Sequence, residues 1–494
     1  MADYHNLTIS QASKLLQSGE VSSAALTESI LKRIEEIDPK VKAFISVTAR
    51  EALSQAKESD LRREKGQTLG KLDGIAMSIK DLLCTTGIET TAASNILKGF
   101  VPEYDATVVK KLKDAGIVIV GKTNLDAFAH GSSTENSDFF TSKNPWDLER
   151  VPGGSSGGSA ASVAAGECFG SIGTDTGGSI RQPASLCSVV GLKPTYGRVS
   201  RYGVIAMASS LDVVGPLAKT AEDAAIILEA IAGCDPLDPT TLDAPVPSYF
   251  ENLATSIEGM KIGIPEEYFT SGMDADVEKV VRSAIETFEK LGAQVVQISL
   301  PHTDYALSTY YILQPAEVSS NLSRYDGIKY GHSVLLPGEK IPLEDVYMQS
   351  RGEGFGEEAK RRIMLGTYVL SAGYYDAYYK KALQLRTLVK QDFEKAFDAD
   401  IDVIVTPVSP TPAFKIGEKA DDPVKMYLSD IYTVPINPAG VPAISTPAGF
   451  VERGGVRLPV GIQIIAPMLC EQRLLDTSNV FEKETKITEE RAKI

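Results

Sequence analysis

Residues 151–195 hold the side chains best suited to chemistry. This segment of 45 residues contains ten glycines and eight serines. Two strings within it place serine beside paired glycines, Gly153–Gly158 (GGSSGG) and Asp175–Arg181 (DTGGSIR). Glycine lets the backbone turn tightly and approach another group closely. The pattern therefore predicts an exposed hydroxyl with several backbone N–H groups around it.

A serine among aimed N–H groups suits acyl transfer. The hydroxyl attacks a carbonyl carbon, and the N–H groups stabilise the oxyanion that forms. We predict Ser179 as the nucleophile. The candidate oxyanion donors are the backbone amides of one turn: Thr176, Gly177, Gly178 and Ser179.

A phosphate-binding loop is the alternative interpretation of these glycines. Such a loop follows the pattern G-x-x-x-x-G-K-[ST], in which a lysine reaches the phosphates. No lysine follows Gly157 or Gly158. The sequence therefore disfavours nucleotide binding by this segment.

A serine nucleophile needs a base, and the histidines do not offer one. None of the four histidines lies near a G-x-S-x-G elbow. Gly74–Asp81 (GIAMSIKD) is a short apolar run with Lys80 at its end, which predicts a buried strand that carries a lysine. Burial would lower the pKa of this amine until it is neutral. From position alone, a solvated Lys80 remains the alternative.

Four strings together resemble the amidase signature family: GIAMSIKD, GGSSGGS, GTDTGGSIRQPA and GLKPT. The spacings also match, with 75 positions from Lys80 to Ser155 and 24 from Ser155 to Ser179. The resemblance implies a serine–serine–lysine triad. Ser179 would form the acyl ester, Ser155 would bridge after a cis peptide bond, and Lys80 would be the neutral base.

Further strings resemble one branch of that family, the glutamine-hydrolysing A subunits of tRNA-dependent amidotransferases. They are Gly131–Asn136 (GSSTEN), Asn321–Gly331 and residues 353–381. The resemblance implies a heterotrimer in which this chain assembles with the B and C subunits. It implies no cofactor or metal in this chain, and use of ATP and Mg²⁺ by the B subunit. Misacylated tRNA, Glu-tRNA(Gln) or Asp-tRNA(Asn), would be held mainly by the B subunit. A stand-alone small-molecule amidase and a non-catalytic scaffold protein remain the alternatives.

Glutamine as substrate requires a cation for its carboxylate and a carboxylate for its ammonium group. The resemblance assigns these roles to Arg362, with Arg361 as the less favoured choice, and to Asp430. It places Tyr310 at the border of the pocket. Without the resemblance, these residues would be interpreted as surface charges and a core tyrosine. The tyrosines of residues 374–379 have helical spacing, which is typical of core packing.

The composition restricts the possible partners and location. The formal net charge is −15, which makes the chain poorly suited to hold a polyanion by itself. Its five cysteines are scattered with no metal-ligand spacing, as expected for reduced thiols in the cytoplasm. No apolar run reaches the length of a membrane-spanning helix. Because residues 1–6 are mostly polar and no apolar run follows them, we expect no signal peptide.

Alternating helical and strand patterns predict an α/β fold, a mixed central sheet flanked by helices on both faces. We expect one large domain, residues 1–494, because no long linker interrupts it. Its expected portions are an N-terminal helical part (8–65), a catalytic core (70–220), a glutamine-pocket part (260–450) and a C-terminal strand and helix (455–494).

Overall fold

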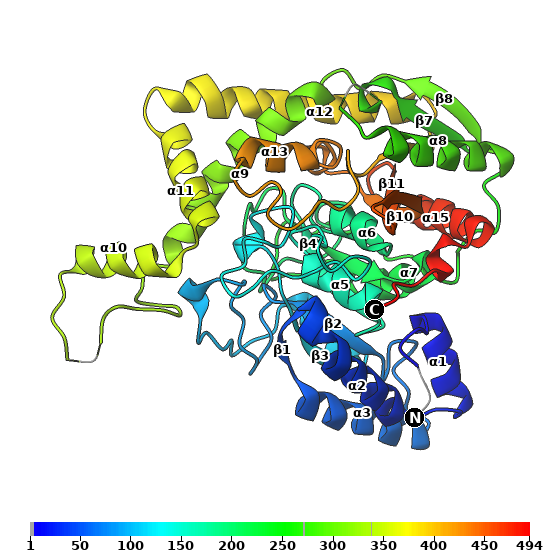
Figure 1. The fold of residues 1–494 in the computed structure, drawn as a ribbon, viewed down its shortest axis with the longest axis horizontal. Coiled ribbons are helices and arrows are strands. Elements are labelled where there is room, and N and C mark those ends of the chain that lie inside the picture. Colours follow the sequence, from blue (N-terminus) through cyan, green and yellow to red (C-terminus); the bar gives the residue numbers. More distant parts are fainter. Residues whose placement is uncertain (1–3, 270–271, 337) are drawn as a thin grey trace.

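One mixed sheet organises the protein (Figure 1). The computed structural model describes residues 4–269, 272–336 and 338–494. Its 11 strands lie in the order β1-β3-β2-β4-β6-β5-β10-β11-β9-β7-β8. The predicted α/β class is confirmed. The strands are β1 Phe44–Val47, β2 Ala76–Lys80, β3 Val118–Thr123, β4 Gly170–Asp175, β5 Val190–Lys193, β6 Val213–Ala218, β7 Lys261–Pro265, β8 Gln294–Ile298, β9 Val403–Pro407, β10 Ala443–Arg453 and β11 Val456–Ile465.

Helices lie on both faces of this sheet. Gly170 and Gly173 show this directly, because side chains of opposite parity on a strand point to opposite faces. A Cβ at Gly170 would contact Ile227 of α7, whereas one at Gly173 would contact Ser156 at the start of α5. The helices are α1 Ile9–Ser18, α2 Ser23–Val41, α3 Ala49–Glu64, α4 Thr107–Asp114, α5 Gly157–Ala164, α6 Arg181–Cys187, α7 Ala221–Ile231, α8 Ala275–Lys290, α9 Ala306–Asn321, α10 Leu343–Gly354, α11 Glu357–Leu370, α12 Lys380–Asp398, α13 Pro423–Tyr427, α14 Ile436–Ala439 and α15 Glu471–Thr485.

Capping residues define the ends of the first helix and the start of the second. Thr8 and Gln11 form a reciprocal capping box, and Gly19 ends α1 in the left-handed conformation. Ser22 caps α2 through the Ala25 N–H. α2 continues past Pro39 to Val41. Pro39 lies in the last turn, where it removes a single helical hydrogen bond.

The β7–α8–β8 unit joins the same sheet. β7 pairs in parallel with both β8 and β9, so this unit forms one edge. At the other edge, β1 pairs antiparallel with β3. Between them, β2 pairs in parallel with β3 and β4. The carboxyl ends of β2 and β4 therefore lie side by side, at the same end of these parallel strands.

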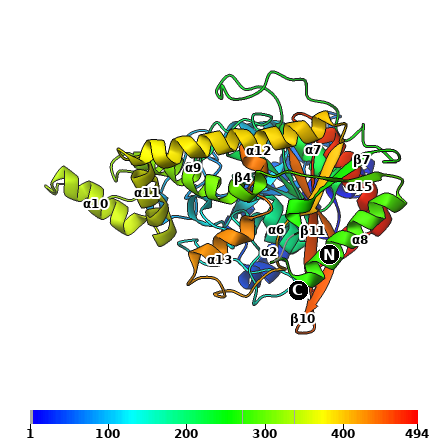
Figure 2. The ribbon, with the colours of Figure 1, turned by 90° about the horizontal axis from the view of Figure 1, so that it is seen from above.

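Helices α10 and α11 extend away from the body of the protein, as both views show (Figures 1 and 2). The tyrosines that follow α11 are exposed, so the expectation that they belong to the core is wrong. Tyr374, Tyr375 and Tyr378 are each about two-fifths exposed, in and beside a short π-helical turn, Tyr375–Tyr379. Their rings pack on one another instead, with centroids of Tyr374 and Tyr378 5.9 Å apart.

In the described part of the chain, no helix is both long and apolar enough to cross a membrane. The core is instead divided between two clusters. The larger one lies around β2, β3, β4 and the helices on them. The smaller one, which includes Tyr310 and Tyr432, lies under α9 and α12.

Gly366 allows α11 to approach α9, and we expect Gly366→Ala to destabilise the fold. The added Cβ would overlap the Pro315 carbonyl and lie 2.9 Å from Ser319 Cβ. Overpacking of this kind costs about 1–3 kcal/mol in the free energy of unfolding. Gly352→Ala in α10 is the matched control, because its Cβ would meet no atom within 4 Å. Thermal unfolding should show a lower Tm for G366A alone; equal Tm values would contradict the close packing.

Candidate active site

Lys80 ends β2 and points into a cluster of hydroxyl groups. Its Nζ lies 2.8 Å from Ser155 Oγ, 2.9 Å from Ser156 Oγ and 2.9 Å from Thr174 Oγ1. Thr174 is in β4, the parallel neighbour of β2, so pairing of the two strands sets this contact. Among the described residues, no carboxylate forms an ion pair with Lys80.

The environment of Lys80 favours the neutral amine. Its side chain is completely buried. Burial lowers the pKa of Lys80 from 10.5 to about 7, although the negative charges of Asp126, Asp175 and Asp212 act in the opposite direction. Hydroxyl groups provide hydrogen bonds without a full counter-charge. A substantial fraction of the amine is therefore unprotonated near neutral pH.

Ser155 follows a cis peptide bond, Gly154–Ser155. Several polar contacts hold this loop. The Gly154 N–H donates to Gln182 Oε1 at 2.9 Å, and Thr134 Oγ1 donates to the Gly153 carbonyl at 2.7 Å. Ser155 is fully buried, so its hydroxyl can contact only the groups that surround it.

Ser179 lies beside the Ser155 loop and lines a cavity. The Ser156 N–H donates to the Ser179 carbonyl at 3.1 Å, which joins the two loops through their backbones. No hydrogen bond joins the Ser155 and Ser179 hydroxyls among the described residues. The hydrogen-bonded row thus runs from Lys80 to Ser155, and its last link is open in this structure.

The four predicted oxyanion donors lie in the turn from Thr176 to Ser179, but one of them, the Gly178 N–H, is already bound. Gly178 has a φ of +133°, which a residue with a side chain rarely adopts. Its N–H donates to Asp175 Oδ1 at 2.9 Å. Within the described chain, the amides of Thr176, Gly177 and Ser179 donate to no backbone or side-chain acceptor. These three remain free to face a ligand.

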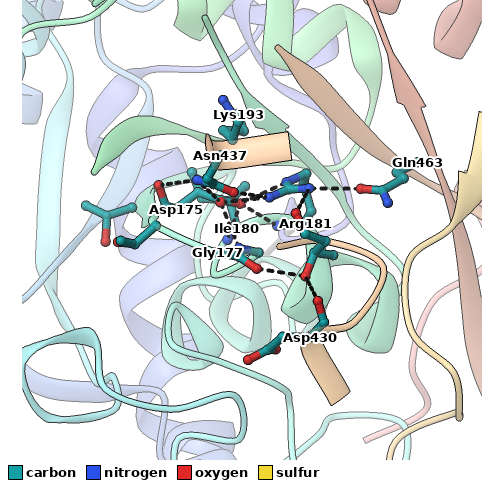
Figure 3. Close-up of polar contacts among 12 residues, drawn as sticks. Asp175, Gly177, Ile180, Arg181, Lys193, Asp430, Asn437 and Gln463 are labelled. Carbon is teal, nitrogen blue, oxygen red and sulfur yellow. Dashed lines mark hydrogen bonds and ion pairs between the residues drawn. The ribbon is translucent and has the colours of Figure 1, made fainter. Parts of the chain in front are cut away.

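Arg181 and Asp175 form the centre of a buried network (Figure 3). Arg181 Nε and Nη2 each lie 3.0 Å from an oxygen of Asp175. The guanidinium also donates to Asn437 Oδ1 at 2.7 Å and to Gln463 Oε1 at 2.9 Å. Burial alone would raise the pKa of Asp175, but the charge and hydrogen bonds of Arg181 lower it to about 2. The network joins the turn to β11 and to residues 433–437.

A cavity of about 160 Å³ opens beside Ser179. Side chains of both charges line it. They are Glu135, Glu358, Arg361, Arg362, Lys419 and Asp430. A cavity with this arrangement suits a small zwitterion better than an apolar ligand.

Asp430 is a buried carboxylate in the wall of this cavity. Ser132 Oγ donates to Asp430 Oδ2 at 2.6 Å, and the Tyr311 hydroxyl donates to the same oxygen at 3.2 Å. Burial raises the pKa of Asp430 to about 7, with these hydrogen bonds and the charges of Arg362 and Lys419 acting against it. A cationic ligand group in contact with Asp430 would favour its ionised form.

Arg362 and Arg361 differ in their surroundings. Arg362 is buried, with its guanidinium carbon 4.7 Å from the ring centroids of both Tyr311 and Tyr427. Its Nε donates to Glu358 Oε1 at 2.6 Å and its Nη1 to Gln314 Oε1 at 2.6 Å. Arg361 pairs with the other oxygen of Glu358 and is 44% exposed. Fixed between two rings, Arg362 is the better oriented of the two for a bidentate contact.

Tyr310 forms the wall between the cavity and the turn. It is buried, and a Cβ at Gly177 would lie 2.9 Å from its ring. Burial raises the pKa of its hydroxyl. Of the predicted site residues, the structure brings Gly177, Ser179, Tyr310, Arg362 and Asp430 to one cavity. Lys80 and Ser155 lie in the hydroxyl cluster beside it. Thr176 and Gly178 belong to the same turn as Gly177 but do not line the cavity. The histidine that the sequence places in this region, His130, is buried with neither ring nitrogen hydrogen-bonded to a described residue.

Sequence reasoning missed several polar residues that hold the site. Asp126 accepts N–H groups of Thr134 at 2.9 Å and Asn136 at 3.1 Å, which orders the loop that carries Ser132. Thr174 contacts Lys80, and Arg181 anchors the turn. The pair of charges in DTGGSIR was a visible signal for Arg181. Asp126 had no such signal, because its partners are backbone amides.

Comparison with known proteins places these features in context. The sequence pattern of the family described as Amidase matches residues 25–475. The chain is 55% identical over 483 residues to the A subunit of the glutamyl-tRNA(Gln) amidotransferase of Moorella thermoacetica, covering 98% of this chain and 97% of that one. The corresponding protein of Carboxydothermus hydrogenoformans is 53% identical over the full length of both.

Two solved structures have the same fold. The crystal structure of the glutamyl-tRNA(Gln) amidotransferase A subunit from Thermotoga maritima has a TM-score of 0.80 and 43% identity, covering 98% of this chain and 96% of that one. The peptide amidase of Stenotrophomonas maltophilia has a TM-score of 0.80 and 30% identity, covering 98% of each.

Arg181→Met should destabilise the protein strongly, because it leaves Asp175 buried without its cation. Removal of one partner of a buried pair costs about 3–5 kcal/mol. The double variant with Asp175→Asn should lose less than the sum of the two single variants. Denaturant unfolding followed by circular dichroism would measure this. Additive losses would contradict the direct pairing.

Proposed function

This chain belongs to the amidase family, and from that premise we propose that it is the glutamine-hydrolysing component of a tRNA-dependent amidotransferase. One observation carries the chemical part of the proposal: Lys80 is completely buried against three hydroxyl groups, with a pKa near 7. A neutral amine at this position can accept a proton, which a solvated lysine cannot do at neutral pH.

The first step is acylation of Ser179. Lys80 accepts the Ser155 hydroxyl proton while Ser155 accepts the proton of Ser179. Ser179 Oγ attacks the side-chain amide carbon of glutamine. A hydrogen bond between the Ser155 and Ser179 hydroxyls would complete the row, and the backbones of the two loops are already hydrogen-bonded to each other. Such links tighten when substrate is bound.

The negative charge that develops on the amide oxygen is stabilised by backbone N–H groups. Thr176, Gly177 and Ser179 supply the free amides of the turn, since the Gly178 N–H is bound to Asp175. Collapse of the intermediate transfers the proton from Lys80, through Ser155, to the leaving nitrogen. Ammonia leaves, and a glutamyl ester of Ser179 remains. Water then attacks the ester by the same proton route, which releases glutamate.

Charges in the cavity favour glutamine over a neutral amide. The ammonium group would contact Asp430, and the carboxylate would contact Arg362. Arg362 Nη2 donates to no acceptor in the described part of the chain, so it is available for this contact. Arg361, exposed at the cavity mouth, is the second choice. A stand-alone amidase for a neutral substrate would leave these buried charges without a role.

The relatives are named as A subunits, which supports assembly with further subunits. We propose a heterotrimer in the cytoplasm, in which ammonia passes to the B subunit and the C subunit completes the complex. The B subunit would use ATP and Mg²⁺ to activate glutamate on tRNA(Gln), or aspartate on tRNA(Asn). The net charge of −15 agrees with a tRNA held mainly by that partner.

The decisive experiment is co-expression with the neighbouring genes, followed by affinity purification of this chain. The purified complex should convert Glu-tRNA(Gln) or Asp-tRNA(Asn) to the amidated form with glutamine and ATP. Glutamine hydrolysis by the chain alone, with no copurifying proteins and no conversion of tRNA, would favour a stand-alone amidase. Unchanged conversion by Ser179→Ala would favour a non-catalytic scaffold.

Ser179→Ala should abolish glutamine hydrolysis without unfolding the protein. Removal of a nucleophile that acts as part of a unit lowers kcat by roughly 10³-fold or more. Ser283→Ala is the matched control, because Ser283 lies on the exposed side of α8. Ammonia release and Tm should be measured for both variants. Residual activity of S179A within tenfold of the wild type would refute the assignment.

The activity should rise with pH through about 7, since Lys80 acts only when it is neutral. Below its pKa of about 7, protonation of Lys80 by itself should lower kcat/KM about tenfold for each pH unit. Asp430 also has a pKa of about 7 and acts when ionised, so its titration acts in the same direction. Rates from pH 5.5 to 9 should be compared for the wild type and Asp430→Asn. The rise should persist in D430N; a flat profile would exclude Lys80 as the base.

A further inference from the structure

Thr433 lies between the carboxylate of the cavity and the oxyanion turn. It is fully buried. Its hydroxyl donates to the Gly177 carbonyl at 2.8 Å and to the Asp430 carbonyl at 3.2 Å. A hydroxyl has a single proton to donate, so these two acceptors share one hydrogen bond. Thr433 therefore joins the segment that carries Asp430 to the turn that precedes Ser179.

The peptide unit between Gly177 and Gly178 is held at both of its polar ends. Its carbonyl accepts from Thr433, and its N–H donates to Asp175 Oδ1 at 2.9 Å. The N–H groups of Gly177 and Ser179, on either side of this peptide unit, have no acceptor in the described chain and can donate to an oxyanion. The orientation of this peptide plane thus determines where those two amides point.

Close packing prevents Thr433 from moving independently of the turn. A Cβ at Gly178 would overlap Thr433 Oγ1, so the two residues are in direct contact. From the other side, Arg181 Nη1 donates to the Thr433 carbonyl at 3.0 Å. Figure 3 shows these contacts continuing from Gly177 to Asp430. A shift of the Asp430 segment must therefore be transmitted to the turn.

We infer that Thr433 is a positioning residue that couples the α-ammonium group of the substrate to the oxyanion turn. In the proposed site the ammonium group contacts Asp430. Asp430 and Thr433 lie in one short turn, in which the Thr433 N–H donates to the Asp430 carbonyl at 3.0 Å. The Thr433 hydroxyl in turn fixes the Gly177 carbonyl. The inference rests on the proposed glutamine site. It explains how a substrate group remote from the reacting carbon can affect kcat as well as binding.

The test compares two substrates, glutamine and glutaramate, which is glutamine without its α-amino group. Thr433→Val keeps the shape and removes the hydroxyl. We expect T433V to lower kcat for glutamine at least tenfold with KM changed less than threefold. Wild-type enzyme should have a higher kcat for glutamine than for glutaramate, and this ratio should shrink at least fivefold in T433V. Thr433→Ser, which keeps the hydroxyl, should stay within threefold of the wild type.

Thr48→Val is the matched control, since the Thr48 hydroxyl also donates to a buried carbonyl, that of Ile119, at 2.8 Å. It should keep both kcat values. An equal loss of kcat for both substrates in T433V would overturn the coupling, as would an unchanged kcat for glutamine. If T433V fails to fold, Asp430→Asn gives the second test. Coupling requires that D430N lower kcat for glutamine at least fivefold, and an effect on KM alone would contradict it.

The outcomes also separate this inference from the proposed function. A wild-type complex that hydrolyses no glutamine would refute the proposed function and the inference together. A wild-type complex that hydrolyses glutamine, with equal kcat for glutaramate, would refute the inference alone.

Discussion

Removal of one lysine amine from water is the constraint on which the rest of the site depends. Lys80 is held by hydroxyl groups, and its negative neighbours act on it only at a distance. An ion pair with a carboxylate would have kept the amine protonated. The glycine-rich and serine-rich composition of residues 151–195 follows from this requirement, because small residues allow two loops to surround the amine without charge.

The same chain segment also needs a rigid anchor, and Arg181 provides it. Its guanidinium binds Asp175 and also side chains of α14 and β11. The Asp175 carboxylate in turn accepts backbone N–H groups of the turn. Loss of one partner of such a buried pair lowers the free energy of unfolding by several kcal/mol, whereas the intact pair adds little to it. The pair therefore acts mainly to define a geometry. It connects the turn after β4 to segments more than 250 residues further along the sequence.

The cavity is assembled from parts of the chain that have no local relationship. Ser132, Arg362 and Asp430 come from a loop after β3, from α11 and from the turn before α14. The charges of Arg362 and Asp430 would be costly to bury separately. Aromatic rings of Tyr311 and Tyr427 orient the arginine, and hydroxyl groups orient the aspartate. In the proposed function, Arg362 and Asp430 would bind the ends of the substrate while Ser179 carries out the chemistry, and the turn at Thr433 connects the two parts.

The sequence by itself determined the α/β class and the candidate residues Lys80 and Ser179, and its resemblance to the amidase signature family added Ser155. Strand periodicity, capping residues and the glycine–serine strings are local signals, so they can be interpreted without coordinates. Only the tertiary structure decided that Thr174 contacts Lys80, that Asp126 orders the loop of Ser132, and that Thr433 touches the turn. It also decided that the tyrosines after α11 are exposed. The physical reason is that burial and hydrogen bonding depend on which strands and helices pack together. These elements are far apart in the sequence, so a local pattern does not specify their packing.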